Sequence, residues 1–218
     1  PFATKVNSEA SGLSPKSTDL RFPSIPGYSI EEVLGQGGMG RVYLGRDLQL
    51  GRLVAIKCLV DTSNPQLLRR FEEEAKSVSR LRHPNIAQLY GFQSQSEPAF
   101  LVMELVPGGT LADFIQKRPL EGNLAAKILA TIARAIGYAH QNDIVHRDLK
   151  PSNILIGGEK LHAGERESKE FDVSRIRIAD FGLAKKISGD ANLTRTGDIV
   201  GTPSYMSPEQ AAGVVSRI

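Results

Sequence analysis

The spacing of apolar and polar residues divides the chain into a strand-rich first part and a helix-rich second part. Short apolar or alternating runs, bounded by turn residues, occur at 28–34, 41–45, 53–60, 86–92 and 100–106. Helical periodicity appears at 65–81 and, beyond Pro107-Gly108-Gly109, at 124–141. The pattern predicts an α+β fold of two lobes, in which a small antiparallel sheet with one helix precedes a mainly helical lobe.

The first 27 residues differ from the rest, because they are rich in Ser and Pro and have no sustained periodicity. This composition predicts a flexible leader over 1–27. The predicted organisation is therefore a leader, an N-terminal lobe over 28–106 and a C-terminal lobe over 107–218.

Composition and charge remove several classes of function. The 218 residues include 27 Lys and Arg against 24 Asp and Glu, and no run of five or six like charges forms a nucleic-acid-binding arm. The most apolar helical stretch contains Lys127 and Arg134, so it falls short of a membrane span. Cys58 is the single cysteine, which excludes an internal disulfide and a Cys-rich metal site and favours a reducing compartment.

A glycine-rich turn, Gly35-Gln36-Gly37-Gly38-Met39-Gly40, joins the first two predicted strands. Glycines let the backbone amides approach a polyphosphate, because no Cβ stands in the way. An ordinary tight hairpin has a similar composition. A dinucleotide fingerprint would need a helix directly after the turn and a Walker loop would need Gly-Lys-Ser/Thr, and neither follows.

Lys57 and Glu74 are predicted to form an ion pair. Lys57 ends an apolar strand, a position from which lysine usually reaches solvent. With Phe71 at zero on a helical wheel, the apolar residues of 65–81 fall within about ±80° and Glu74 lies at about −60°, on the same stripe. Because a buried carboxylate is costly without a cation, we expect Glu74 to hold the Lys57 ammonium in position for phosphate oxygens.

Two polar segments further along carry the residue types that phosphoryl transfer requires. Such transfer needs a carboxylate beside the incoming hydroxyl, positive charge at the transferred group and divalent cations on the phosphates. Taken singly, polar residues at such positions usually cap helices or make turns. The acceptor, the cation and the two metal ligands are predicted to be, in chain order, Asp148, Lys150, Asn153 and Asp180.

With these motifs, the chain resembles over residues 28–212 the catalytic domain of the eukaryotic-like (Hanks-type) Ser/Thr protein kinases of bacteria. The resemblance implies transfer of a phosphoryl group from ATP to Ser/Thr hydroxyls of proteins, itself included, with Mg²⁺ or Mn²⁺. It implies that Asp148 is the catalytic base, that Lys150 neutralises the γ-phosphate and that Lys57, held by Glu74, contacts the α- and β-phosphates. Asn153 and Asp180 would hold the metal.

The resemblance also implies the residues that surround the nucleotide. Leu34, Val42, Ala55 and Leu155 would sandwich adenine. The backbone from Glu104 to Val106, behind Met103, would bond its edge, and Thr110 would contact the ribose. The complete set of expected nucleotide contacts is Leu34, Gly35, Gln36, Gly37, Gly38, Met39, Gly40, Arg41, Val42, Ala55, Lys57, Glu104, Val106, Thr110 and Leu155.

By the same resemblance, the polar stretch between Asp180 and Glu209 is an activation loop. Its phosphosite candidates are Thr194 and Thr196, of which we favour Thr196 slightly, with Arg147 as the phosphate partner. His146 is expected to be structural and to pack near Phe181.

The chain departs from the family in two places. Asn153 and Asp180 are 27 positions apart, which is about twice the usual separation, and the polar excess at 157–173 is predicted to loop into solvent. The chain also stops nine residues after Glu209, where the family continues with further helices. A truncated C-terminal lobe is therefore expected, and the first residue, Pro1, also indicates a fragment or a processed chain.

Two alternatives follow from these departures and from the fold. A non-catalytic nucleotide-binding or scaffold module is compatible with truncation, although Lys57, Asp148 and Asp180 are all retained. A small-molecule kinase of related fold is disfavoured by Lys150 and by Ser207-Pro208-Glu209. Protein substrates are expected, with no nucleic acid, no membrane segment in this chain and a cytoplasmic location, while a membrane anchor after residue 218 is left open.

Overall fold

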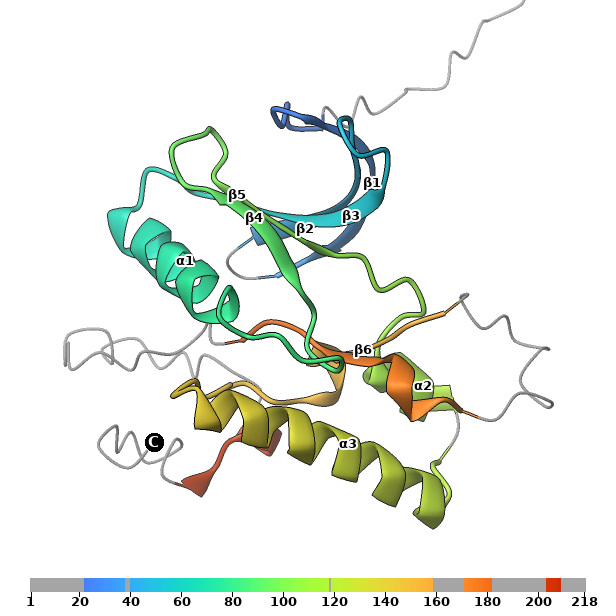
Figure 1. Ribbon diagram of the computed structural model, residues 1–218. Coiled ribbons are helices and arrows are strands. Elements are labelled where there is room, and N and C mark those ends of the chain that lie inside the picture. The colour runs from blue at the N-terminus through green and yellow to red at the C-terminus, as the bar shows by residue number, and fades with distance from the viewer. Residues whose placement is uncertain (1–21, 38–39, 118, 159–170, 182–202, 209–218) are drawn as a thin grey trace, which may run out of the picture.

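The computed structural model describes residues 22–37, 40–117, 119–158, 171–181 and 203–208. Figure 1 shows two lobes, an upper one built on a sheet and a lower one in which helices predominate. The chain passes from the upper to the lower lobe after the strand Phe100–Glu104. The predicted α+β bilobal fold is therefore confirmed.

The upper lobe contains an antiparallel sheet in the order β1-β2-β3-β5-β4. Its central strand β3 is buried from Val54 to Leu59, because a cluster of apolar side chains covers one face and a helix covers the other. This double burial explains the nearly continuous apolar run in the sequence. The strands are β1 (Tyr28–Gln36), β2 (Gly40–Asp47), β3 (Leu53–Leu59), β4 (Leu89–Gln93) and β5 (Phe100–Glu104).

Helix α1 (Pro65–Val78) crosses the inner face of this sheet. It begins with proline after Asn64, whose side chain accepts hydrogen bonds from the NH groups of Gln66 and Leu67 at 3.0 and 3.3 Å. Phe71 and Glu74 are both buried, so the predicted inward stripe is confirmed. The helix ends at Val78, three residues before the predicted end, where the chain turns toward the lower lobe.

The strand predicted at 86–92 is corrected to β4, which begins only at Leu89. Ile86 is buried as its pattern suggested, but it bridges in parallel to Ile178 in the lower lobe. The Ala87 NH donates to the Ile178 carbonyl at 2.9 Å, and the Ile178 NH donates to the Asn85 carbonyl at 2.8 Å. The segment before β4 therefore joins the two lobes.

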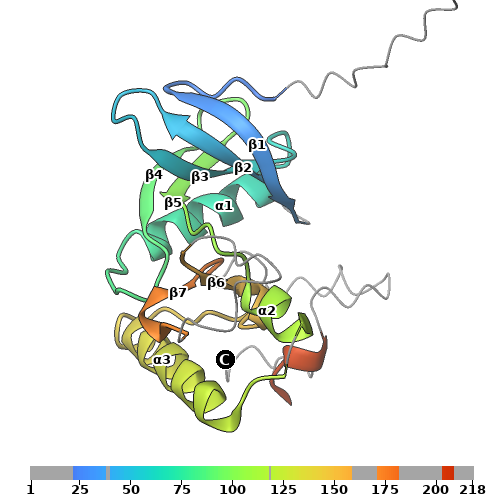
Figure 2. The same ribbon diagram turned by 90° about the vertical axis from the view of Figure 1, so that its right-hand side faces the viewer.

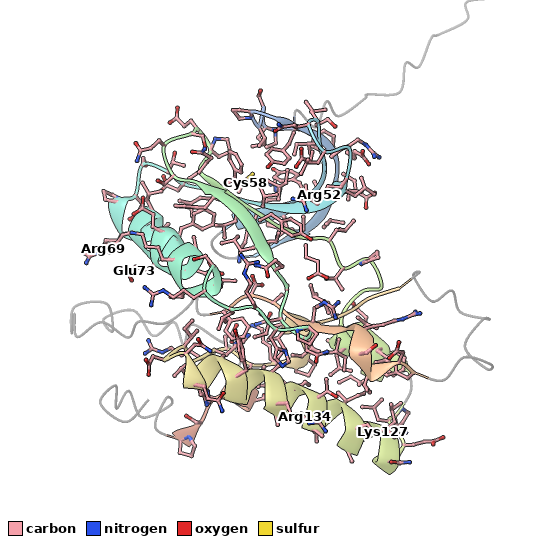
Figure 3. All side chains as sticks on the ribbon, viewed as in Figure 1. Arg52, Cys58, Arg69, Glu73, Lys127 and Arg134 are labelled. Atoms are coloured by element: carbon pink, nitrogen blue, oxygen red, sulfur yellow. The ribbon has the colours of Figure 1, made fainter. Side chains whose placement is uncertain are left out.

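The lower lobe packs helix α3 (Gly122–Gln141) against a short antiparallel hairpin, β6 (Ile154–Ile156) and β7 (Ile176–Ile178). Ile128 and Ala135 of α3 share one core with the isoleucines of both strands. Figure 3 shows Lys127 and Arg134 on the outer face of α3. Among the described residues, no helix is long and apolar enough to cross a membrane.

Short elements complete this lobe beside the hairpin, as the side view in Figure 2 shows. Helix α2 (Leu111–Lys117) was not predicted, because seven residues are too few to establish a helical period. Phe171, near the end of the predicted insertion, has its ring centred 5.0 Å from that of Phe114 in α2. The 3₁₀ turns are η1 (Pro151–Asn153), η2 (Val173–Arg175) and η3 (Pro203–Tyr205).

Two of the last residues of the predicted leader contact the upper lobe. Ile25 is buried in the core of the upper lobe and bridges to Tyr28. Phe22 meets the ring of Tyr43 edge-on at 6.3 Å. The leader before Phe22 lies outside the described residues, as do 159–170 of the insertion and 182–202 of the activation loop.

Gly108, in the connection after β5, lies close to the backbone of Ile156 in β6, and a substitution there tests this contact. A Cβ on Gly108 would overlap the carbonyl oxygen of Ile156, so Gly108→Ala should reduce the free energy of unfolding by about 2 kcal/mol. Gly137→Ala is the matched control, because nothing lies within 4 Å of a Cβ there and alanine favours helix by up to about 1 kcal/mol. Urea titration followed by circular dichroism measures both changes. Equal effects of the two substitutions would contradict the proposed contact.

Candidate active site

The glycine-rich turn closes a hairpin directly above the junction of the lobes. The Gly37 NH donates to the Gly40 carbonyl at 2.8 Å, and Arg41 donates to the Gln36 side chain at 3.1 Å. Gly40 must lack a side chain, because a Cβ there would lie 2.5 Å from the carbonyl oxygen of Cys58 in β3. Gly38 and Met39 lie outside the described residues. The rest of the turn is therefore held close over the end of β3 that carries Lys57.

Lys57 connects the two lobes electrostatically. Its side chain is on the buried strand β3, and the residue is only 7% exposed. The Lys57 Nζ lies 2.7 Å from Asp180 Oδ1, just beyond β7. Burial lowers the pKa of Lys57, but attraction to Asp180 and Glu74 outweighs this effect and raises the pKa overall. Partial burial raises the pKa of Asp180, and the Lys57 charge outweighs that effect too, so the Asp180 pKa is lowered.

Glu74 faces the same region but makes a different arrangement from the predicted one. It is 6% exposed, and its Oε2 has no hydrogen-bond partner among the residues that the structure describes. It lines a small cavity together with Met103 and Phe181. Burial in these surroundings raises the pKa of Glu74 to about 8, while Lys57 opposes the rise. At neutral pH Glu74 is therefore largely protonated.

The ion pair predicted between Lys57 and Glu74 is not among those found in the described part of the chain, where Lys57 pairs with Asp180. The difference in burial explains the choice of partner. The Asp180 side chain is 43% exposed, so its charged form is less costly to maintain than that of the enclosed Glu74. Sequence reasoning placed all three side chains in one region but chose the wrong pair.

The segment after α3 holds a second polar cluster around Asp148. Lys150 Nζ lies 2.8 Å from Asp148 Oδ2. The Asn153 amide donates to the Asp148 backbone oxygen at 2.7 Å and to Oδ2 at 3.2 Å. These bonds fix the orientation of the Asp148 carboxylate, whose side chain is nevertheless accessible to a substrate. The three predicted residues are thus brought together.

His146 supports this cluster from below. It is buried, its Nε2 lies 3.0 Å from the Ala179 carbonyl oxygen, and its ring is centred 4.6 Å from that of Phe181. Burial lowers the pKa of His146, which favours the neutral ring. This packing agrees with the structural role expected for His146.

The two predicted metal ligands lie next to each other. The Ala179 NH donates to the Asn153 carbonyl at 2.9 Å, which brings Asp180 beside Asn153. Because the Asn153 NH₂ group is directed at Asp148, its amide oxygen points elsewhere and suits a hard cation. No group of three or more His, Cys, Asp or Glu residues gathers in the described ranges. An amide oxygen beside a carboxylate fits Mg²⁺, which is usually bound by few protein ligands and completes its shell with water and phosphate oxygens.

The expected adenine contacts come from both lobes. In the sheet, Val42 lies opposite Lys57 and Ala55 lies opposite Met103. Below them, Leu155 of β6 forms an isolated bridge with Thr110. Leu34 and Gly35 belong to the edge strand β1, and Val106 lies in the connection after β5. Thr110 Oγ1 donates to Asp113 at 2.7 Å. A flat ligand would thus lie between sheet and hairpin.

The side chain of Glu104 and its partner Arg177 were missed by sequence reasoning. Arg177 Nε donates to Glu104 Oε1 at 3.0 Å. The NH of Glu104 donates to the Gln88 carbonyl at 2.8 Å, so this residue can offer adenine its carbonyl oxygen rather than its NH. No local pattern marks the pair, because the residues are 73 positions apart.

Enzymes that transfer phosphoryl groups from nucleotides require such lysines and carboxylates, gathered here where the two lobes meet. The sequence model described as the protein kinase domain matches residues 28–214. The chain belongs to the protein kinase domain family.

Its relatives are bacterial kinases of greater length. The chain is 43% identical over 189 residues to the Serine/threonine-protein kinase PrkC of Bacillus subtilis, covering 85% of this chain and 27% of that protein. It is 37% identical over 194 residues to PknB of Mycobacterium tuberculosis, covering 85% and 29%. It thus spans less than a third of these two relatives. A crystal structure of a double mutant of the PknI kinase domain of Mycobacterium tuberculosis matches with a TM-score of 0.62 and 26% identity, covering 88% of this chain and 66% of that one.

The raised pKa of Glu74 predicts a pH-dependent stability. The folded chain holds this proton up to about pH 8, whereas an unfolded Glu releases it near 4.5. The Glu74 contribution is therefore fully present below pH 4.5 and is lost as the pH rises to about 8. Relative to Glu74→Gln, the parent should lose on the order of 1–3 kcal/mol of unfolding free energy between pH 5 and 8.

Urea unfolding at a series of pH values measures this difference. Glu72→Gln, on the outer side of the same helix, controls for the loss of one negative charge. Parallel pH curves for the parent and Glu74→Gln would show that Glu74 is ionised in the folded chain.

Proposed function

We propose that the chain catalyses transfer of the γ-phosphoryl group of ATP to Ser/Thr hydroxyls of proteins. The observation that carries the proposal is the Asp148 carboxylate, oriented by Lys150 and Asn153. This acceptor lies on a different segment from the Lys57–Asp180 pair, so a hydroxyl and a triphosphate can be bound by separate groups.

We assign the general base to Asp148, and its oriented, partly exposed carboxylate supports this role. It would accept the proton of the incoming hydroxyl as the new oxygen–phosphorus bond forms and the bond to the ADP oxygen breaks. Lys150, 2.8 Å from Asp148 Oδ2, is placed to contribute positive charge to the transferred group. ADP leaves with the electron pair of the broken bond.

Lys57 and the glycine-rich turn would hold the triphosphate, and Asn153 and Asp180 would hold Mg²⁺ or Mn²⁺. When bound, the metal supplies positive charge that offsets the charge on the phosphate oxygens. The low exposure of Lys57 strengthens its attraction to phosphate, because little water competes at that point. The need for ATP and the single buried Cys58 support a cytoplasmic location.

A non-catalytic scaffold is less well supported. Lys57, Asp148 and Asp180 are all present, Lys57 pairs with Asp180 and Asp148 pairs with Lys150, and relatives such as PrkC are named serine/threonine-protein kinases. A scaffold role would explain neither the oriented carboxylate nor the retained lysines.

Asp148→Asn tests the proposed base. It should lower transfer of label from γ-labelled ATP, to the chain itself and to a generic basic protein, by roughly 100-fold or more. Nucleotide affinity should stay within about twofold, because Asp148 contacts the hydroxyl rather than ATP. The matched control is Asp172→Asn, an exposed carboxylate in the turn before β7. Transfer by Asp148→Asn at the parent rate would refute the assignment of the base.

We also propose autophosphorylation within the activation loop, mainly at Thr196 and secondarily at Thr194, both outside the described residues. After incubation with Mg²⁺ and ATP, mass spectrometry should find the added phosphate on these threonines. Thr196→Ala should remove most of the incorporated label, and Thr194→Ala should remove less. Label that persists unchanged in the double alanine variant would place autophosphorylation elsewhere.

A further inference from the structure

A three-residue cluster lies at the point where the connection between the lobes begins. Glu104, at the end of β5, accepts from Arg177 Nε on Oε1 at 3.0 Å and from the Gln88 NH on Oε2 at 3.2 Å. The Glu104 NH in turn donates to the Gln88 carbonyl at 2.8 Å. Glu104 is therefore fixed at both its backbone and its carboxylate.

Arg177 is fixed just as firmly from the other lobe. Its Nη1 donates to the carbonyl oxygens of Ser174 and Ile176 at 3.0 and 3.1 Å. Its neighbours Ile176 and Ile178 are completely buried, so the strand that carries Arg177 is anchored in the lower core. Arg177 projects from the opposite face of that strand, toward Glu104.

These local bonds distinguish the pair from an ordinary surface ion pair. Exposed pairs contribute little, because two long side chains lose freedom when they meet. Here each side chain is held by another partner and is 25% exposed, so less freedom remains to be lost. The pair can thus hold the two lobes at a fixed distance from each other.

The ends of the Glu104–Arg177 pair lie beside residues expected to form the two opposite sides of the adenine site. Arg177 is the antiparallel partner of Leu155, the expected floor of that site. Glu104 is the partner of Val54 and is adjacent to Met103, which lies opposite Ala55 in the expected ceiling. One end of the ion pair is thus attached beside the floor and the other beside the ceiling.

We propose that Glu104 and Arg177 are positioning residues that hold the two lobes at the separation required to bind the nucleoside part of ATP. The proposal rests on the proposed function, because it presumes that a nucleotide binds between the lobes. Neither side chain is assigned a contact with the phosphates or with the protein substrate.

Charge-neutralising variants distinguish positioning from a simple electrostatic effect. Removal of the Glu104 charge in Glu104→Gln would tighten ATP binding if only long-range charge mattered. If instead the Glu104–Arg177 pair is a tether that holds the lobes at the right separation, its loss weakens ATP binding. We expect Glu104→Gln and Arg177→Gln each to raise the dissociation constant of Mg-ATP by about three- to tenfold. The double variant should be no weaker than the weaker single variant, because both changes remove the same interaction.

The matched control is Arg46→Gln. Arg46 Nε lies 2.9 Å from Glu31, but both residues belong to the upper sheet, so this pair cannot set the distance between lobes. Its loss should change Mg-ATP affinity by less than about 1.5-fold. Adenosine, which carries no phosphate, is the second probe and should lose affinity by the same factor as ATP in the Glu104 and Arg177 variants.

Titration calorimetry of the 218-residue chain with Mg-ATP and with adenosine gives these constants, and thermal unfolding without ligand reports folding. If Arg177→Gln unfolds, Arg177→Lys replaces it and should retain part of the affinity. Unchanged affinity, additive losses or tighter ATP binding by Glu104→Gln would overturn the tether alone. A parent chain that binds neither probe would overturn the proposed function and the tether together.

Discussion

The ammonium group of Lys57 is the constraint on which the active site depends. A cation that is 7% exposed requires a nearby negative charge, which the carboxylate of Asp180 supplies at 2.7 Å, while the Glu74 carboxyl faces the same region. Asp180 belongs to the lower lobe and Glu74 to helix α1, so the position of one charge couples three parts of the molecule. Docking of the lobes and neutralisation of the lysine are therefore a single physical problem.

The three-residue strand β7 and the residue Asp180 after it make several of the contacts that dock the lobes. Its buried isoleucines anchor it in the lower core, while Ile178 exchanges backbone hydrogen bonds with the segment before β4. Arg177 reaches the end of β5, and Asp180, two residues after the strand ends, reaches Lys57. A short strand with so many partners gives the proposed catalytic groups a rigid support without needing a large interface between the lobes.

Periodicity predicted the features that depend on local spacing. It placed Glu74 on the buried face of α1, because one helix determines that geometry. Periodicity did not predict contacts for which two distant segments of the chain are alternative partners. Ile86 has the apolar character of a strand residue whether it pairs with β5 or with β7, and the sequence does not indicate which. The same holds for the choice of Lys57 between two carboxylates and for the Glu104–Arg177 pair, because burial and distance arise only on folding.

Asp180 has a φ of 58°, in the left-handed region that asparagine, aspartate and glycine adopt most readily. In the genetic code a single base change converts an aspartate codon into one for asparagine or for glycine. Both replacements remove the carboxylate while retaining the backbone conformation. One mutational step can thus remove the proposed metal-binding charge without straining the backbone, and the buried Lys57 ammonium would then have only the Glu74 carboxyl, of the two that attract it, as a source of negative charge.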